Sequence, residues 1–148
     1  MVRNFDHVTL VVQDVTRAKA FFEALGFQEV GRMAISGEPY ASYMGLPAFE
    51  ADHISLALSG RDPNIEVQLL HFRVPEALPD PWVRTLVRLG FNHVCFEVDD
   101  IEKEVARLKE AGFFPKNALL RYQERKLIFI EGPEGVTIEL SERLNKRC

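Results

Sequence analysis

Strand-like and helix-like patterns of hydrophobic residues alternate at the start of the chain. Residues 5–12 (FDHVTLVV) are rich in aromatic and β-branched side chains and show the rough alternation of a strand. Asp14 then stands at the N-cap position of a helix, and Gly26 stands where a left-handed residue ends one. Between them, apolar residues recur at helical spacing: Val15, Ala18, Phe22 and Leu25. The pattern predicts a strand, a capped helix and a glycine stop.

The same order of elements recurs later in the chain. Residues 5–27 (FDHVTLVVQDVTRAKAFFEALGF) align without a gap with residues 91–113 (FNHVCFEVDDIEKEVARLKEAGF), at a constant offset of 86 (93 − 7 for the histidines). Eight of the 23 aligned pairs are identical, whereas ordinary residue usage gives roughly one or two by chance. The identical pairs are Phe5/Phe91, His7/His93, Val8/Val94, Val12/Val98, Asp14/Asp100, Ala20/Ala106, Gly26/Gly112 and Phe27/Phe113. The chain is interpreted as a duplication with pseudo-symmetric halves.

Further apolar runs predict strands after each helix. In the first half they are expected at 27–33, near 40–44, at 53–58 and at 65–72; in the second half at 113–116, 125–130 and 136–140. Asp80-Pro81 predicts the start of a short helix that carries Trp82, Leu86 and Leu89. We therefore expect a single domain over residues 1–148, with module one at about 1–73, a connector at about 74–90 and module two at about 91–148.

Composition and charge narrow the class of protein. The chain has 148 residues, of which 47% are hydrophobic and 27% charged, as in ordinary globular proteins. Its formal net charge of −4 argues against nucleic-acid or anionic-membrane partners, which need a basic face. Transmembrane and signal segments are not expected, and the two cysteines do not make a disulfide framework. We expect a cytoplasmic protein.

Two histidines occupy matching positions in the duplicated strands. A single strand histidine is more often structural than a ligand, but His7 and His93 recur at the same place in each copy. Near the end of the second half, Glu139 stands among apolar neighbours, where an unpaired carboxylate is costly to desolvate. A metal ion held by His7, His93 and Glu139 would supply the missing cation. The alternative is that the strand carrying Glu139 is an edge that faces water.

Three runs of the sequence resemble the vicinal-oxygen-chelate (glyoxalase/bleomycin-resistance/extradiol dioxygenase) superfamily. They are residues 6–8 (DHV), 92–100 (NHVCFEVDD) and 132–140 (GPEGVTIEL). The resemblance implies an α+β fold of two tandem βαβββ modules that form a half-open, curled mixed sheet. It also implies one divalent metal, held by His7, Gln68, His93 and Glu139. Glu66 would replace Gln68 if the register slipped by two residues.

The resemblance also implies a class of reaction. Gln68 stands where glyoxalase I-like members carry glutamate, so the ligand set is nearest to that of methylmalonyl-CoA epimerase-like members. These relatives imply an epimerase, isomerase or glyoxalase-type lyase that takes a proton from the carbon next to a carbonyl and holds the enolate on the metal. Glu139 is one candidate base and Glu50 another, although a solvated loop carboxylate is the commoner role for Glu50. Zinc, nickel, cobalt, manganese and iron all suit such ligands.

The sequence leaves the roles of several other residues, and two other functions, open. Structural or exposed roles are expected for Asp52, His53 and His71, while some basic residues are candidates to meet an anionic substrate: Arg32, Arg61, Arg73, Arg121 and Lys126. Two histidines with one carboxylate would also suit an Fe(II) ring-cleaving dioxygenase. A third alternative is a non-catalytic, bleomycin-resistance-like protein that binds a small molecule. The family resemblance further implies a small-molecule substrate and a homodimer that covers open sheet edges.

Overall fold

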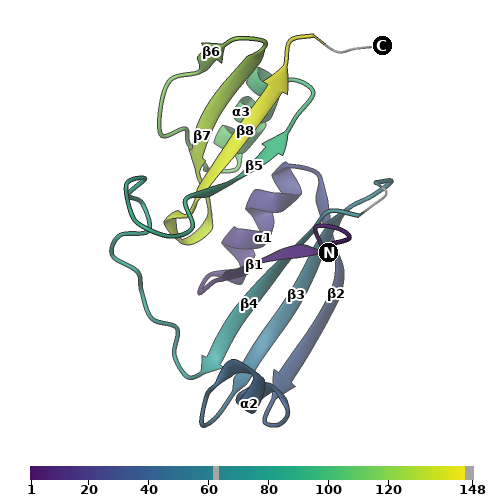
Figure 1. The fold of residues 1–148 in the computed structure, drawn as a ribbon, viewed down its shortest axis with the longest axis vertical. Coiled ribbons are helices and arrows are strands. Elements are labelled where there is room, and N and C mark those ends of the chain that lie inside the picture. The colour runs from purple at the N-terminus through teal and green to yellow at the C-terminus, as the bar shows by residue number, and fades with distance from the viewer. Residues whose placement is uncertain (62–63, 146–148) are drawn as a thin grey trace. The chain divides into compact units, whose positions relative to one another are not determined.

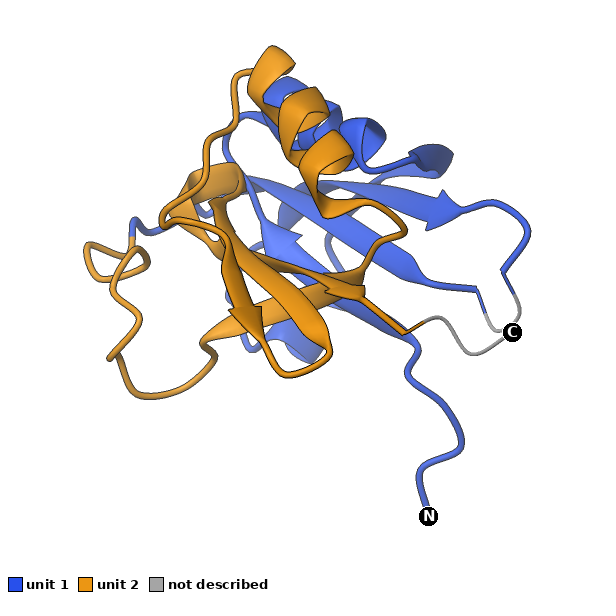
Figure 2. Ribbon diagram, turned by 90° about the horizontal axis from the view of Figure 1, so that it is seen from above, with its two compact units in different colours: residues 1–79 blue, residues 80–148 orange. Residues whose placement is uncertain are grey.

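The chain forms two compact units, each built around its own sheet. The computed structural model describes residues 1–61 and 64–145 (Figure 1). Unit one spans Met1–Pro79 and unit two spans Asp80–Cys148 (Figure 2). The boundary between the units falls inside the connector expected at residues 74–90.

Unit one is a four-stranded mixed sheet with one long and one short helix. Its elements, in chain order, are β1 (His7–Val11), α1 (Val15–Ala24), β2 (Phe27–Ser36), α2 (Tyr40–Met44), β3 (Glu50–Leu58) and β4 (Glu66–Val74). The strand order is β1-β4-β3-β2. The first strand runs parallel to the last, while the other neighbours are antiparallel.

Unit two repeats this topology. Its elements are β5 (His93–Glu97), α3 (Ile101–Glu110), β6 (Leu120–Tyr122), β7 (Arg125–Glu131), the 3₁₀ helix η1 (Pro133–Gly135) and β8 (Thr137–Arg143). The strand order is β5-β8-β7-β6, with β5 and β8 parallel. The expected α+β class with two tandem βαβββ modules is confirmed.

The predicted helix ends are confirmed in both copies. The Asp14 carboxylate accepts a hydrogen bond from the Arg17 amide at 2.9 Å, and Asp100 accepts one from the Lys103 amide at 3.0 Å. Gly26 and Gly112 follow the helices with φ of +93° and +85°, which glycine adopts without steric strain. The duplicated sequence therefore encodes the same start and stop twice.

Alternate residues of each sheet face the core. In unit one, Leu56 and Leu69 are fully buried, and α1 contributes Phe21 and Phe22 to the same apolar layer. In unit two, the buried layer comprises Ile101, Leu108, Ile130, Ile138 and Leu140. Because side chains alternate along a strand, the residues between these core positions face the other side of each sheet. That second face carries the candidate site residues.

The segment Tyr40–Met44 is a helix, so the strand expected near residues 40–44 is wrong. Its first turn is closed by the Ala41 amide, which donates to the Gly37 carbonyl at 2.8 Å. Gly45 ends it in the left-handed region with φ of +68°. Ala41 alone is buried here. A five-residue apolar run does not distinguish helix from strand by periodicity, and the flanking glycines decided the outcome.

The short helix expected after Asp80-Pro81 is also wrong, because residues 81–84 form only turns. Asp80 does act as a cap, accepting a hydrogen bond from the Trp82 amide at 2.9 Å. The three apolar side chains that suggested a helix face, Trp82, Leu86 and Leu89, are all exposed. Without a packed apolar face, a segment this short does not gain enough to hold helical structure.

In the second half, residues 113–116 do not form the expected strand. They make a single bridge, between Pro115 and Ile130. Proline has no amide hydrogen and cannot continue a ladder of hydrogen bonds. The fourth strand of this sheet is β6, which the hydrophobic pattern did not reveal because its three residues are all exposed.

None of the helices in the described ranges 1–61 and 64–145 is long and apolar enough to cross a bilayer.

Glu29 of β2 contacts two cations, one on α1 and one on its own strand. Its carboxylate contacts Lys19 of α1 at 2.8 Å and accepts a hydrogen bond from Arg32 at 2.9 Å. The Arg32 hydrogen bond, together with that of Lys19, lowers the pKa of Glu29 to about 2. Because the unfolded carboxyl keeps its ordinary pKa of 4.5, the charged form stabilises the fold above that pH.

We expect Glu29→Gln to lower the free energy of unfolding near neutral pH. The difference from the parent should shrink as the pH falls from 4.5 toward about 2, because the parent loses this contribution when Glu29 is protonated. Urea unfolding across this range measures it, with Glu110→Gln on the exposed part of α3 as control. A difference that does not change with pH would contradict the assignment.

Candidate metal centre

Strand pairing places Gln68 and Glu139 at equivalent positions in the two sheets. Gln68 pairs with Thr9 of β1, and Glu139 pairs with Cys95 of β5. Thr9 and Cys95 are themselves equivalent in the repeat (95 − 9 = 86). Glu66 instead pairs with His7. The register therefore makes Gln68, and not Glu66, the counterpart of Glu139.

In unit two, a histidine and a carboxylate lie in direct contact on adjacent strands. His93 Nε2 is 2.9 Å from Glu139 Oε2, and both side chains are partly buried. The Phe129 ring packs edge-on against the imidazole, with ring centroids 5.1 Å apart. Strand β8 lies between β5 and β7. The alternative that Glu139 belongs to a water-facing edge strand is therefore wrong.

The His93 imidazole and the Glu139 carboxylate offer two atoms of the kinds that bind divalent metals. Imidazole nitrogen and carboxylate oxygen are ordinary ligands of zinc, manganese, iron, nickel and cobalt. The other ring nitrogen of His93, Nδ1, already lies 2.7 Å from Asn92 Oδ1. Nε2 is thus the nitrogen left to meet a further partner, and it faces a carboxylate. A proton or a metal ion between these two atoms would satisfy both of them, so the residues fit a divalent metal.

In unit one, the Gln68 amide is held by three neighbours on the same sheet face. Its Oε1 accepts hydrogen bonds from His53 Nε2 at 3.0 Å and from the Thr9 hydroxyl at 3.3 Å. Its Nε2 donates to Glu66 Oε1 at 2.8 Å. His7 lies on the neighbouring strand β1, opposite Glu66, and its Nδ1 contacts the Asp6 carboxylate. His7 therefore shares this sheet face with Gln68.

His53 also belongs to this polar group, through its contact with Gln68 Oε1. Strand β3 carries buried Ile54 and Leu56 on the core side. Alternation therefore directs His53 and Ser55 to the opposite face, where Ser55 pairs with Gln68. That alternation was the signal in the sequence, but only the register between β3 and β4 brought His53 beside Gln68.

Glu50 lies away from this group. It is the first residue of β3 and pairs with Val74, five residues before Ser55, which puts it about 17 Å along the strand at about 3.4 Å per residue. Its surroundings form a separate cavity of about 440 Å³, lined by Ser36, Gly37, Glu38, Ala41, Pro47, Ala48, Phe49, Glu50 and Val74.

Other polar candidates in unit one have structural partners. Arg73 binds the Asp52 carboxylate, with the shortest contact at 2.7 Å. His71 Nδ1 contacts the Val12 carbonyl at 3.0 Å. Arg32 is paired with Glu29, while Arg61 is exposed. None of these contacts involves His7 or Gln68.

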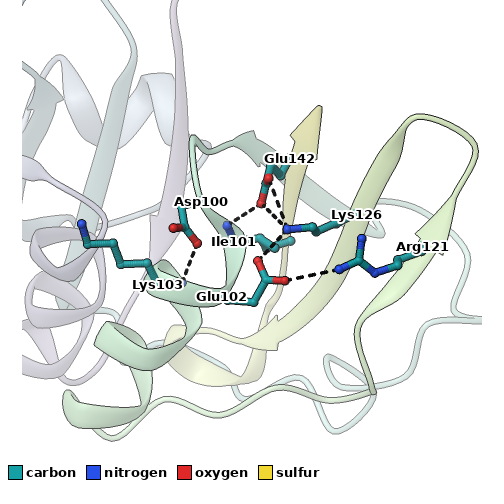
Figure 3. Close-up of polar contacts among 7 residues, drawn as sticks. All are labelled: Asp100, Ile101, Glu102, Lys103, Arg121, Lys126 and Glu142. Carbon is teal, nitrogen blue, oxygen red and sulfur yellow. Dashed lines mark hydrogen bonds and ion pairs between the residues drawn. The ribbon is translucent and has the colours of Figure 1, made fainter. Parts of the chain in front are cut away.

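An acidic cluster in unit two already contains its own cation. Figure 3 shows the Lys126 ammonium between Glu102 and Glu142, at 2.8 Å and 3.2 Å, while Arg121 lies 3.7 Å from Glu102. Glu142 also accepts a hydrogen bond from the Ile101 amide at 2.8 Å. The hydrogen bond between Glu102 and Lys126 raises the pKa of Lys126 and lowers that of Glu102. This cluster fastens α3 to β7 and β8, and its chemistry is that of a salt-bridge network.

A polar cavity of about 790 Å³ also lies in unit two. It is lined by Glu97, Val98, Asp99, Glu124, Arg125, Arg143 and Asn145. Glu97 follows His93 and Cys95 at alternate positions of β5, so these three residues share one face of the strand. Arg143 binds Glu97 at 2.7 Å. The volume is in the range of small-molecule sites.

The sequence of this chain is similar to a known family and to individual proteins of known activity. Residues 4–140 match the family described as Glyoxalase/Bleomycin resistance protein/Dioxygenase superfamily. An ethylmalonyl-CoA/methylmalonyl-CoA epimerase from Cereibacter sphaeroides is 30% identical over 115 residues, covering 76% of this chain and 73% of that protein. Glyoxalase I of Saccharomyces cerevisiae is 28% identical over 144 residues, covering 91% of this chain. The match spans 43% of the yeast protein.

Solved structures share the fold. A glyoxalase family protein from Bacillus cereus superposes with a TM-score of 0.89 at 28% identity, covering 98% of this chain and 97% of that one. The fosfomycin resistance protein FosX from Listeria monocytogenes, in complex with Mn(II) and sulfate, has a TM-score of 0.60 at 16% identity, covering 96% of this chain and 93% of that one. At that identity, the likeness to FosX shows the fold alone.

The thiol of Cys95 is expected to react slowly. Desolvation of the thiol and the neighbouring Glu139 carboxylate raise its pKa from 9.0 to about 12, which lowers the thiolate fraction near neutral pH. In a Cys148→Ser background, alkylation near neutral pH should be correspondingly slow, and Glu139→Gln should speed it. The denatured protein is the control and should react at the ordinary rate. Equal rates for folded and denatured protein would contradict this.

Proposed function

Because this chain belongs to the Glyoxalase/Bleomycin resistance protein/Dioxygenase superfamily, we propose that it is a metal-dependent epimerase, isomerase or glyoxalase-type lyase. Its reaction removes a proton from the carbon next to a carbonyl group of a small-molecule substrate. The observation that carries the proposal is the contact of His93 Nε2 with Glu139 Oε2 at 2.9 Å. Within residues 80–145, no lysine or arginine contacts this pair in the way that Lys126 contacts the acidic cluster.

The proposed metal ligands are His7, Gln68, His93 and Glu139. In support, each unit offers one histidine on its first strand and one oxygen donor at the equivalent position of its last strand. FosX, which shares the fold, was solved with Mn(II). When bound, a divalent metal polarises a carbonyl oxygen and stabilises the negative charge that develops as the proton leaves.

The amide of Gln68 favours epimerase-type chemistry within this family. Two neutral histidines, one neutral amide and one carboxylate leave a divalent ion with a formal charge of +1. A glutamate at position 68 would cancel that charge. A less neutralised site is a stronger electrophile toward a carbonyl oxygen. The epimerase from Cereibacter sphaeroides, which matches three quarters of this chain, supports the same class.

Proton transfer is assigned to Glu139 in preference to Glu50. Glu139 stands on the sheet face that carries His93, and its carboxylate contacts the imidazole. Glu50 lies about 17 Å along β3 from Ser55, the residue opposite Gln68. A general base must come within hydrogen-bonding reach of the proton it takes.

One observation favours a second candidate, an Fe(II) ring-cleaving dioxygenase. Gln68 Oε1 already accepts hydrogen bonds from His53 and Thr9. If the amide keeps these partners, the ligands reduce to His7, His93 and Glu139, the two-histidine, one-carboxylate set of non-haem iron enzymes. Iron content together with oxygen uptake in the presence of a catechol separates this candidate from the epimerase.

Elemental analysis of the purified protein should find about one divalent metal per chain. His7→Ala, His93→Ala and Glu139→Ala should each lower metal affinity at least about 100-fold, because each removes a ligand atom. The control is His71→Ala, since His71 bonds a backbone carbonyl elsewhere in unit one. Full metal content in His93→Ala protein would contradict the proposed site.

The metal-loaded enzyme should incorporate solvent deuterium into a 2-substituted malonyl-CoA or an α-hydroxycarbonyl compound. Glu139→Gln should slow the exchange by about 10²–10⁴-fold, the usual contribution of a general base. Glu50→Gln should leave the rate within a few-fold of the parent. The opposite ranking of these two variants would move the base to Glu50.

A further inference from the structure

Each candidate histidine ligand contacts the side chain of the residue just before it. His7 Nδ1 contacts the Asp6 carboxylate, and His93 Nδ1 lies 2.7 Å from Asn92 Oδ1. Asp6 and Asn92 are equivalent in the repeat (92 − 6 = 86) although their residue types differ. In both copies, a side-chain oxygen of the preceding residue therefore contacts Nδ1 of the imidazole, although the two side chains differ.

The orientation of the Asn92 amide follows from its second partner. Asn92 Nδ2 donates to the backbone carbonyl of Leu86, which can only accept. The oxygen of the amide is therefore the atom that faces His93 Nδ1. Because an amide oxygen also only accepts, His93 Nδ1 must carry the proton. In the first copy, the carboxylate of Asp6 imposes the same requirement on His7 Nδ1.

A neutral imidazole with its proton on Nδ1 presents a lone pair at Nε2. In unit two, Nε2 is the nitrogen that lies 2.9 Å from Glu139 Oε2. Histidine ligands of metals commonly donate the other ring N–H to an oxygen, which fixes the ring and its tautomer. We propose that Asp6 and Asn92 are positioning residues that fix the Nδ1–H tautomer of His7 and His93, so that both rings present Nε2 to the divalent metal. This inference rests on the proposed metal site.

The two copies also indicate which substitutions should be tolerated. A carboxylate serves His7 and an amide serves His93, so Asp6→Asn and Asn92→Asp should both keep an acceptor on Nδ1. Asp6→Ala and Asn92→Ala remove it. Asn92→Asp and Asn92→Ala both lose the donor to the Leu86 carbonyl. Any difference between these two variants therefore reports the acceptor, and not the anchoring of the loop.

The first experiment reads the tautomer in the metal-free protein by ¹⁵N NMR of the imidazole rings. The parent should carry a proton on Nδ1 of both His7 and His93, and so should Asn92→Asp at His93. Asn92→Ala should shift His93 toward the Nε2–H form without changing His7. A His93 Nδ1 without a proton in the parent would overturn the inference, whether or not the protein binds metal.

The second experiment measures Zn²⁺ affinity by competition with a chromophoric chelator. Asn92→Ala and Asp6→Ala should bind about 10–100-fold more weakly, as usual when a ligand loses its orienting partner. Asn92→Asp and Asp6→Asn should stay within a few-fold of the parent. The matched controls are Asn145→Ala, whose amide donates to Glu124, and Asn4→Ala in the same N-terminal segment as Asp6.

The outcomes separate this inference from the proposed function. If the parent protein binds no Zn²⁺, the proposed metal site is contradicted. The NMR experiment then tests the position of the imidazole proton on its own. A parent that binds Zn²⁺ while Asp6→Ala and Asn92→Ala bind equally well overturns the positioning role. Equal weakening in Asn92→Asp and Asn92→Ala, both confirmed as folded by circular dichroism, also overturns it, because loop anchoring would then explain the loss.

Discussion

The parallel pairing of the first and last strands of each unit is the constraint on which the candidate site depends. β1 pairs with β4, and β5 pairs with β8, in sheets that are otherwise antiparallel. A parallel pair needs a long crossover, here a helix and the intervening strands. His93 and Glu139 are 46 positions apart in the sequence (139 − 93) and meet only because this ladder forms.

The burial of apolar residues in the core fixes the register of these strand pairs. Leu69 of β4 and Ile138 of β8 are buried on the helix side of their sheets. A slip of one residue would move them to the opposite face and drive Gln68 and Glu139 into the apolar layer. Burying an unpaired carboxylate or amide is costly, so packing on one face enforces the arrangement of polar groups on the other. Stability and candidate chemistry thus depend on the same alternation.

The two halves share the same strand pairing but differ in the chemistry of the oxygen donor on the last strand. In unit one the oxygen donor is a neutral amide, and Thr9, His53 and Glu66 surround it with hydrogen bonds. In unit two the donor is a carboxylate that contacts the His93 imidazole, and the Phe129 ring packs against the same imidazole. All the formal negative charge of the proposed ligand set therefore comes from one half.

The sequence by itself determined the duplication, the fold class and the helix ends. These depend on local patterns: an offset of 86, an aspartate cap and a glycine stop in each copy, and strand-like runs around His7 and His93. It also identified the family, because the motifs that carry the resemblance are contiguous. The sequence did not determine the secondary structure of short segments that lack a packed apolar face, as Tyr40–Met44 and residues 81–84 show.

Only the tertiary structure decided the register and the neighbours of each candidate residue. The equivalent register of Gln68 and Glu139, the approach of His53 to Gln68 and the distance of Glu50 from Ser55 all follow from which strands pair and with what offset. Strand pairing is a contact between segments far apart in the chain. Each segment alone would accept either register, and the choice falls to the packed arrangement that buries the core-facing apolar residues of all the strands at once.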